Sequence, residues 1–363
     1  MKELGLEILN KIHEHGYVAY IVGGFVRDYL LNIPSNDVDI TTNATPKELK
    51  EIFHDCEIKS ESYGAVILFY KNNRFDITTM RKEMDYLDNR HPSSVLYVDD
   101  LKTDLLRRDF TINALCFDKD GKLIDLINGQ DDLKKKMIRT IGDSDKSFSD
   151  DALRILRAIR FASLFDFNLS DDIKESIIKN RELLKNLSKE RKKEELDKIF
   201  GSNKAKEGIS LIKEFSLEEP LDLDNLSRVN DYSDLVGIWA MINTKAYTFT
   251  SSEKDLIKKI NMAYEKDNLN DYVLYKYGCY VNVLAGINKG ISKKDILEKY
   301  ELLPITRKDE INIKAQEICE ILNKKPGPFI SEIYSDLEEK IVNKELENDN
   351  IKIRDYILEK RNG

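Results

Sequence analysis

The chain has 363 residues, of which 41% are hydrophobic and 34% charged, and its formal net charge at pH 7 is -8. Because single domains seldom grow beyond about 250 to 300 residues, this length predicts at least two packed units. The acidic balance argues against a protein that coats nucleic acid over its whole surface, so any polyanion must be bound at local basic patches.

The N-terminus and the cysteines restrict where the protein is expected to work. The sequence offers no run of about 18 apolar residues, so we expect no membrane span and no membrane partner. Segment 1–17 mixes acids and histidines with Leu and Ile, which predicts an amphipathic helix and not a signal peptide. The cysteines lack metal-ligand spacing, and reduced thiols in a cytoplasmic protein are expected at Cys56, Cys116, Cys279 and Cys319.

The first third of the chain alternates strand-like and helix-like segments. Segments rich in β-branched and aromatic residues predict strands at 17–23, 38–42, 65–70, 74–80 and 111–117. Helical patterns at FVRDYLL and TPKELKEIF lie between the first three of these strands. Beyond Gly129 the Leu, Ile, Lys and Glu residues recur with helical spacing. We therefore expect an α/β unit up to residue 126 and an all-helical remainder.

A glycine turn and two acids follow the first predicted strand. Gly23 and Gly24 close that strand and open a helix, where backbone N–H groups and the positive helix end can face a phosphate. Asp37 and Asp39 begin the next strand, where alternation sends both carboxylates to one face and Val38 into the core. Two acids this close repel each other unless cations lie between them, which predicts two metal ions about 3.5 to 4 Å apart.

Asp76, in the alternating segment RFDIT, is either a third carboxylate beside this pair or a solvent-facing strand acid. The alternative for Asp37 and Asp39 is a pair of exposed acids at a strand end or a helix cap. The glycine turn and the intervening Arg27 favour the metal site.

The segment LLRRDFTINALCF places charged side chains directly before the fifth predicted strand. The guanidinium groups of Arg107 and Arg108 suit phosphate oxygens, and Asp109 is suited to accept hydrogen bonds from sugar hydroxyls. Asn113, two residues beyond Thr111, is expected on the same strand face, where it adds an amide. The alternative is a surface ion pair between Arg and Asp, which contributes little stability.

The segment SDDALRILRAIRFA predicts one helix with an unusual edge. Arg154, Arg157 and Arg160 recur every three residues behind Asp151, while Leu, Ile and Phe residues supply the apolar face. Taken alone, this edge is equally well explained as a solvated basic stripe.

In order along the chain, GGFVRD, DVD, RRDFTINA, DDALRILRAIRFA and ERKKEEL resemble the motifs of the class II tRNA nucleotidyltransferase family, which comprises CCA-adding enzymes and bacterial poly(A) polymerases. The resemblance implies an α/β catalytic head of the nucleotidyltransferase type, related to DNA polymerase beta, over residues 1–126. It further implies a helical neck with a base-recognition helix over 127–200, and a helical body and tail that binds tRNA over 201–363.

The resemblance also implies roles for single residues. Asp37 and Asp39 would hold two Mg²⁺ ions and serve as the catalytic pair. The residues that would contact the nucleotide are Gly24, Arg27, Arg108, Asp109, Asn113, Asp151, Arg154, Arg157 and Arg160.

The helix that carries Asp151 and Arg154 would then read the base. Cytosine and adenine both present an amino donor beside a ring-nitrogen acceptor, and an Asp acceptor next to an Arg donor complements both. Guanine and uracil present the reverse pattern and would be rejected. At positions i and i+3 of one helix, the two side chains would form a protein template for C and A. Arg157 and Arg160 would continue the edge toward phosphates or the primer end.

The chain departs from the family pattern at two motifs. Asp150 stands where the family usually has Glu, and a Lys in ERKKEEL stands where an apolar residue is usual. Glu190, Arg191 and Glu195 are therefore either family site residues or members of ion pairs within the neck helix.

Two connecting segments also resemble the family. The segment between Met80 and Arg107, which includes Arg90 and His91, resembles its flexible loop, and members that add only CC lack that loop. The segment GKLIDLINGQDDL resembles the head-to-neck connector, with Asp125 and Gly129 in matching positions.

These features predict an Mg²⁺-dependent enzyme, a monomer or homodimer, that adds CCA to the 3′ end of tRNA from CTP and ATP. An A-adding enzyme or a poly(A) polymerase of the same family is the first alternative. A non-catalytic RNA-binding module and a nucleotidyltransferase that modifies a small molecule are the others. The paired acids disfavour the former, and the long helical tail disfavours the latter.

Overall fold

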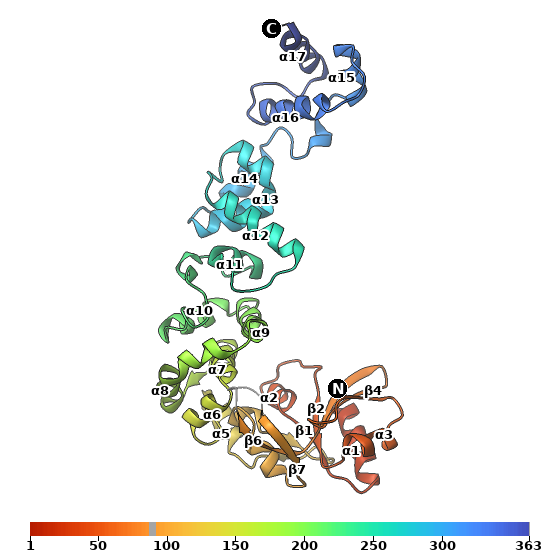
Figure 1. Ribbon diagram of the computed structural model, residues 1–363, viewed down its shortest axis with the longest axis vertical. Helices are drawn as coiled ribbons and strands as arrows, with labels where there is room; N and C mark the ends of the chain where they lie inside the picture. The colour runs from red at the N-terminus through yellow and green to blue at the C-terminus, as the bar shows by residue number, and fades with distance from the viewer. Residues whose placement is uncertain (87–91, 363) are drawn as a thin grey trace. The chain divides into compact units, whose positions relative to one another are not determined.

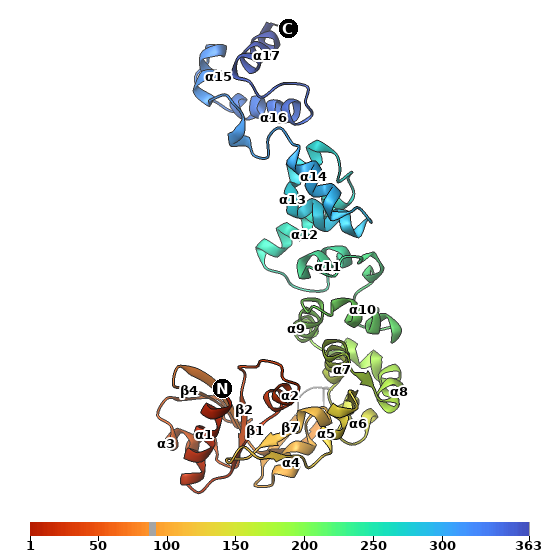
Figure 2. The same ribbon diagram turned by 180° about the vertical axis from the view of Figure 1, so that it is seen from behind.

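The computed structural model describes residues 1–86 and 92–362. The chain divides into two compact units, Met1–Asp222 and Leu223–Gly363, which Figures 1 and 2 show from opposite sides. Among the described residues, none of the helices combines the length and apolar character that a membrane crossing requires.

A seven-stranded sheet forms the base of the first unit. Its strands are β1 (Ala19–Val22), β2 (Asp39–Thr42), β3 (Cys56–Ser60), β4 (Ala65–Tyr70), β5 (Asn73–Thr79), β8 (Cys116–Phe117) and β9 (Leu123–Ile124). The strand order is β3-β4-β5-β2-β1-β8-β9. Only the β2–β5 pair among these runs parallel, with Asp39 opposite Asp76, and β1 pairs with β2 so that Val22 stands opposite Asp39.

Helices α1 (Lys2–Glu14) and α3 (Pro46–Ile52) lie beside this sheet (Figure 1). Gly5 of α1 approaches it so closely that a Cβ there would lie 2.7 Å from Ile21 and 3.5 Å from Val38. Val38 is fully buried on this side. Because side chains alternate along a strand, Asp39 and Thr41 point to the opposite side, away from α1.

A short helix, a hairpin and a turn complete the head. These elements are α2 (Gly24–Leu30), β6 (Arg81–Tyr86), β7 (Pro92–Tyr97), α4 (Leu101–Leu106) and the 3-10 turn η1 (Thr111–Asn113). Strands β6 and β7 pair antiparallel in a sheet of their own. Arg90 and His91, from the segment compared with the family's flexible loop, lie outside the described residues.

The expectation of a strand over 111–117 is wrong for its first half. Thr111–Asn113 form the turn η1, and strand pairing begins only at Cys116. The polar side chains bond locally, since Thr111 Oγ1 donates to Asp132 Oδ2 at 2.7 Å and Asn113 Nδ2 donates to Asp109 Oδ1 at 3.0 Å. Such side-chain bonds compete with strand pairing despite the β-rich composition. Asn113 therefore reaches its place through a turn and not through strand alternation.

Helices form most of the rest of the first unit. They are α5 (Gly129–Lys134), α6 (Ser144–Asp150), α7 (Leu153–Phe165), α8 (Asp171–Asn180), α9 (Lys189–Phe200) and α10 (Ala205–Glu214), with the 3-10 segment η2 (Arg181–Asn186). The expectation of an all-helical remainder is wrong in one detail, because β10 (Met137–Ile138) and β11 (Asn168–Leu169) pair in parallel. The boundaries at 126 and 200 fall inside the first unit and stay predictions.

The connector between head and helices is tightly packed. Asp125 accepts hydrogen bonds from the backbone N–H groups of Ile127, Gly129 and Gln130 at 2.9 to 3.2 Å. A Cβ at Gly129 would lie 2.3 Å from the Thr111 carbonyl oxygen, so only glycine lets α5 approach the turn η1.

The expectation of one helix over SDDALRILRAIRFA is also wrong. Helix α6 ends at Asp150, Asp151 has the extended dihedrals φ -139° and ψ 96°, and α7 begins at Leu153. Asp151 Oδ1 accepts a hydrogen bond from the Leu153 N–H at 3.1 Å. This carboxylate satisfies a backbone donor at the start of α7, and such local side-chain bonds compete with helix formation at Asp151 itself.

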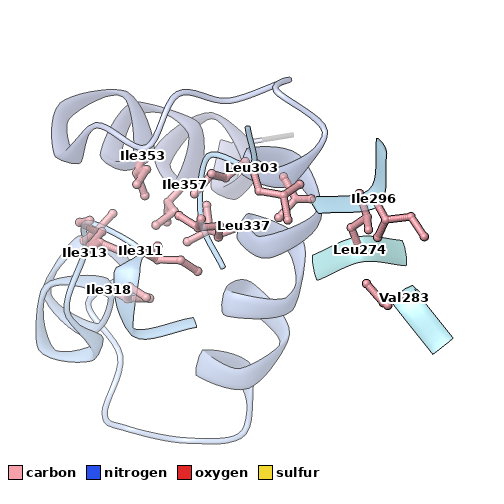
Figure 3. Packing of buried hydrophobic residues seen from close by; sticks show 14 residues of the cluster. Leu274, Val283, Ile296, Leu303, Ile311, Ile313, Ile318, Leu337, Ile353 and Ile357 are labelled. Carbon is pink, nitrogen blue, oxygen red and sulfur yellow. The ribbon is translucent and has the colours of Figure 1, made fainter. Parts of the chain in front are cut away.

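The second unit is helical throughout its regular elements. These are α11 (Leu235–Ile242), α12 (Ser251–Tyr264), α13 (Asp271–Asn288), α14 (Lys293–Glu301), α15 (Ala315–Leu322), α16 (Phe329–Val342), α17 (Asn350–Asn362) and the 3-10 segments η3 (Leu226–Arg228) and η4 (Lys308–Glu310). Figure 3 shows Leu337, Ile353 and Ile357 directed toward Ile311 and Ile313 within one apolar cluster. Burial of such side chains is the main stabilising contribution to this unit.

Candidate active site

One cleft of about 900 Å³ in the first unit gathers all the nucleotide-binding and metal-binding residues that the sequence predicted. It is bordered by the turn between β1 and α2, the start of β2, the segment after α4, and α7. The predicted residues that line it are Gly24, Arg27, Asp37, Asp39, Arg108, Asp109, Asn113, Asp151, Arg154, Arg157 and Arg160. Residues more than a hundred positions apart in sequence therefore face one space.

Asp39 is the first residue of β2, and Asp37 lies two residues before that strand. Burial and then the neighbouring charge of Asp37 raise the pKa of Asp39 to about 6, while the Arg108 guanidinium acts in the opposite direction. The carboxylate of Asp39 is thus destabilised in its charged form, as expected for acids that share a site. A cation between the two acids would remove this penalty.

Asp76 does not complete a three-acid cluster. It stands opposite Asp39 in the register, but Arg74 Nη2 donates to its two oxygens at 3.0 and 3.1 Å. Within residues 1–86 and 92–362, His, Cys, Asp and Glu side chains form no group of three or more that is arranged to hold a metal ion. Two carboxylates still fit Mg²⁺, which prefers hard oxygen ligands and commonly takes only one or two from a protein.

The backbone at Gly23 passes close to the side chains of Arg108 and Asp39. Its φ of 79° lies in the left-handed region, and a Cβ there would lie 3.6 Å from Arg108 Nη1 and 3.7 Å from Asp39 Oδ2. Arg108 Nη2 donates to Asp104 Oδ2 at 3.2 Å, and Arg108 Nε is buried with no hydrogen-bond partner among the described residues. A buried donor without a partner is costly. The Arg108 side chain as a whole is 17% exposed and lines the cleft, where its guanidinium group can meet an anionic ligand.

Asp104, which the sequence analysis did not single out, anchors this wall of the cleft. It is fully buried and accepts hydrogen bonds from Thr41 Oγ1 at 3.2 Å, Arg107 Nη2 at 2.7 Å and Arg108 Nη2 at 3.2 Å. Burial alone would raise the pKa of Asp104, but the charges of Arg107 and Arg108 outweigh it and hold the pKa below its usual range. The spacing of one Asp three and four residues before two arginines was the available signal.

A chain of hydrogen bonds links α2 to α7 across the cleft. Arg27 Nη1 donates to Asn113 Oδ1 at 2.6 Å, Asn113 Nδ2 donates to Asp109 Oδ1 at 3.0 Å, and Arg157 Nε donates to Asp109 Oδ2 at 2.7 Å. Burial opposes ionisation of Asp109, but the Arg157 guanidinium outweighs burial and holds the pKa well below its ordinary value. Phe161 lies beneath three guanidinium groups, at 4.3 to 5.3 Å from those of Arg27, Arg157 and Arg160.

Asp151 and Arg154 meet in the cleft although they do not share a helix. Arg154 Nε lies 4.0 Å from Asp151 Oδ2, and both side chains are about one-tenth exposed. The predicted pairing of an acceptor and a donor therefore exists. It is produced by the extended residue before α7 and not by helical spacing.

The sequence left two interpretations open for Glu190, Arg191 and Glu195: family site residues, or members of ion pairs within the neck helix. The structure places the three side chains differently. Glu195 is buried and accepts from Arg160 Nε at 2.7 Å, so it ties α9 to α7. Arg191 lines the cleft and pairs with Glu194 of its own helix at 3.0 Å. Glu190 is exposed and does not line the cleft.

Other lining residues were not singled out from the sequence. They lie on the β3–β4 hairpin, on strands β5 and β6, and on helices α7 and α9. These residues are Lys59, Ser60, Tyr63, Ala65, Thr78, Arg81, Glu83, Leu153, Phe161, Glu194 and Lys198. Leu153, Phe161 and Glu194 lie within family motifs that the sequence analysis quoted, but their own side chains carried no predicted role. The others belong to no such motif, so only their position in the fold reveals them.

The sheet, the acid pair and the guanidinium-rich cleft define a nucleotidyltransferase with a poly(A) polymerase type of head. Residues 19–139 match the model of the Poly A polymerase head domain family, residues 166–223 match the "Probable RNA and SrmB- binding site of polymerase A", and residues 244–357 match "tRNA nucleotidyltransferase domain 2 putative". This confirms the α/β head and the helical remainder as a fold class.

Comparison with whole chains narrows the class further. The chain is 32% identical over 380 residues to the CCA-adding enzyme of Anoxybacillus flavithermus, a match that covers 97% of this chain and 96% of that relative. The chain belongs to the CCA-adding enzyme family, as the resemblance of its motifs predicted.

Solved structures agree with this assignment. The crystal structure of the Bacillus stearothermophilus CCA-adding enzyme in complex with CTP is 27% identical, with a TM-score of 0.82 over 99% of this chain and 97% of that one. The Thermotoga maritima CCA-adding enzyme complexed with tRNA_CCA is similar in fold, with a TM-score of 0.75 at 22% identity over 99% of this chain and 95% of that one.

Proposed function

We propose that the protein adds CCA to the 3′ end of tRNA without a nucleic-acid template, using CTP and ATP and releasing pyrophosphate. The observation that carries this proposal is that one cleft holds Asp37 and Asp39, the guanidinium group of Arg108 and the Asp151–Arg154 pair. Full-length similarity to enzymes named for CCA addition supports the same reaction.

Asp37 and Asp39 are the proposed holders of two Mg²⁺ ions. The two carboxylates supply hard oxygen donors. Burial, and then the charge of Asp37, raises the pKa of Asp39, and a bound cation would offset that cost. When bound, the ions would lower the pKa of the primer 3′-hydroxyl and neutralise charge on the departing pyrophosphate. The two acids would also orient the primer terminus toward the nucleotide.

The residues that surround the acids are suited to the phosphates and the sugar. Arg108 lines the cleft with a side chain that is 17% exposed and stands beside the backbone of Gly23, so we assign it to the triphosphate. Asp109 and Asn113 are assigned to the ribose. Because Asp109 already bonds to Arg157 and Asn113 to Arg27, these arginines both add positive charge and orient the sugar-binding groups.

The Asp151–Arg154 pair is the proposed reader of the base. One carboxylate oxygen of Asp151 is held by the backbone of Leu153, and the other lies next to Arg154. An acceptor and a donor are thus presented side by side, a pattern complementary to C and to A but not to G or U. Arg160 is bound to Glu195, so we assign it to holding α7 in place.

The remaining partners follow from the reaction. The substrate would be a tRNA, and the helical segments beyond the head would grip it by shape and phosphate contacts. The working compartment would be the cytoplasm, where tRNA is processed.

The test offers purified protein three tRNA transcripts that end at the discriminator base, at C and at CC, with Mg²⁺ and CTP or ATP separately and together. We expect all three transcripts to converge on one CCA end and UTP and GTP to be refused. Extension of the CC-ended transcript alone by one A would identify an A-adding enzyme, and long A tails would identify a poly(A) polymerase. Either result, or no incorporation, contradicts the proposal.

The matched controls are two single substitutions. Asp39→Ala is expected to abolish incorporation while the protein still shifts tRNA in a gel. Asp120→Asn, at an exposed turn acid outside the cleft, is expected to act like the wild type. Loss of tRNA binding in Asp39→Ala would contradict a purely catalytic role for that carboxylate.

A further inference from the structure

The guanidinium group of Arg154 is held by groups outside its own helix. Its Nη1 donates to Ser147 Oγ at 2.8 Å, and its Nη2 donates to the Arg107 carbonyl oxygen at 2.7 Å. Only 12% of the side chain is exposed. A guanidinium group carries five N–H donors in a rigid plane, so two fixed bonds define its orientation and leave donors for a ligand.

Both anchors are themselves fixed. The Arg107 side chain donates to Asp104 Oδ1 at 2.7 Å and to Glu83 Oε1 at 3.2 Å, which holds its backbone in place. Ser147 is buried in α6, with 5% exposure. The orientation of Arg154 is thus set by one wall of the head and by the helix before α7.

Ser147 contacts both members of the base-reading pair. Its hydroxyl accepts from Arg154, and its backbone carbonyl accepts from the Asp151 N–H at 3.2 Å. The carbonyl bond belongs to the end of α6 and is independent of the side chain. The hydroxyl is therefore the one part of Ser147 that acts on Arg154 and that a substitution can remove.

We propose that Ser147 is a positioning residue that sets nucleotide selection by holding the Arg154 guanidinium group in the plane of the incoming base. This inference rests on the proposed function of the Asp151–Arg154 pair. Without the hydroxyl, Arg154 keeps the Arg107 carbonyl and the 4.0 Å ion pair with Asp151, but its Nη1 loses its partner and the guanidinium group can turn out of its plane. It can then donate to the carbonyl of a wrong base as well as to the ring nitrogen of a right one.

The size of the effect follows from the bond that is lost. A hydrogen bond to a charged group corresponds to at least about a tenfold change in an equilibrium. We therefore expect Ser147→Ala to lower the ratio of kcat/KM for CTP to that for UTP about tenfold. The loss should appear mainly as faster UTP addition, because the acids and phosphate-binding arginines are unchanged.

The experiment measures single additions to the tRNA transcript that ends at the discriminator base, with CTP and with UTP. The full-length wild type is compared with Ser147→Ala, Ser147→Thr, Arg154→Ala and Ser163→Ala, and thermal melting confirms that each is folded. Ser163 is the matched control, because it is equally buried, at 4%, but its hydroxyl donates to the Arg160 carbonyl and does not line the cleft.

The proposal requires the ratio of kcat/KM for CTP to that for UTP to be lowered in Ser147→Ala. The ratio should be near normal in Ser147→Thr, which keeps the hydroxyl, and normal in Ser163→Ala. A normal ratio in Ser147→Ala together with a lowered ratio in Arg154→Ala overturns the role of Ser147 and leaves the base-reading pair intact. A normal ratio in Arg154→Ala overturns both the pair and the inference. No incorporation by the wild type overturns the proposed function itself.

Discussion

Arg157 and Asp109 are 48 positions apart in the chain, yet Arg157 Nε donates a 2.7 Å hydrogen bond to Asp109 Oδ2. The bond joins the segment assigned to the ribose to the helix assigned to the base. Asp109 is buried, and its other oxygen accepts from the Phe110 N–H and from Asn113. The arginine thus compensates a buried charge and fixes the distance between two parts of the nucleotide site.

Replacing Arg157 by Met is expected to lower the free energy of unfolding by about 2 to 4 kcal/mol, because it leaves the Asp109 carboxylate buried without its counter-ion. Urea denaturation at pH 7 measures this loss. In a double-mutant cycle, adding Asp109→Asn to Arg157→Met should recover part of the lost free energy of unfolding. Strictly additive effects of the two substitutions would contradict a direct coupling.

The same pair predicts a pH dependence. The pKa of Asp109 is lower in the folded chain than the ordinary value of 3.8, so its ionisation stabilises the fold above that value. This stabilisation is lost as the pH falls through the folded-state pKa. We therefore expect the stability difference between wild type and Arg157→Met to be largest near neutral pH and to shrink below about pH 4.

Asp39→Asn should stabilise the metal-free protein while it removes activity. The pKa of Asp39 is about 6 in the fold against an ordinary 3.8, so its ionisation costs stability at pH above 6. Two pKa units correspond to at most about 3 kcal/mol, which the neutral Asn avoids. Denaturation in EDTA at pH 7.5 and pH 5 measures the difference, which should shrink at pH 5, where Asp39 is protonated.

Mg²⁺ provides a second readout for that variant. It is expected to raise the melting temperature of the wild type and to leave that of Asp39→Asn nearly unchanged, since a ligand stabilises only the state that binds it. An equal shift in both proteins would show that the ions bind elsewhere.

Asp151→Asn is expected to relax base selection while the start of α7 stays intact. The Asn side chain keeps one oxygen for the Leu153 N–H and replaces the other oxygen with an N–H donor. A donor at that position suits the carbonyl of uracil, so UTP addition should rise relative to CTP. Asp151→Ala should also lose selection, and should in addition destabilise the fold by about 1 kcal/mol through loss of the hydrogen bond to the Leu153 N–H. Unchanged discrimination in single-nucleotide assays would reject the base-reading role.

Asp104→Asn is expected to weaken nucleotide binding. The neutral amide cannot hold the guanidinium groups of Arg107 and Arg108 as a carboxylate does, so the arginine beside the triphosphate loses its fixed position. We expect KM for CTP and for ATP to rise together, about tenfold each. Asp99→Asn changes an exposed acid a few residues away and should leave both values unaltered. A change for only one nucleotide would contradict a role at the shared triphosphate.

Much of this protein was predictable from local sequence. The strands that carry Asp39 and Asp76, the helix after Gly24 and the burial of Val38 follow from alternation and from glycine at a turn. The order of the motifs identified the family. These features depend on residues that lie close together in the chain, where spacing and side-chain chemistry determine geometry directly.

The tertiary structure alone decided how those motifs act together. Polar bonds accompany the turn at Thr111–Asn113, and extended Asp151, whose carboxylate accepts from the Leu153 N–H, interrupts the predicted helix. The partners of Arg154 come from Arg107 and Ser147, and no periodicity in the sequence specifies them. Hydrogen bonds between distant segments form only after burial has brought those segments together. The sequence by itself therefore determined which chemical groups the cleft holds, and only the fold decided which of them face each other.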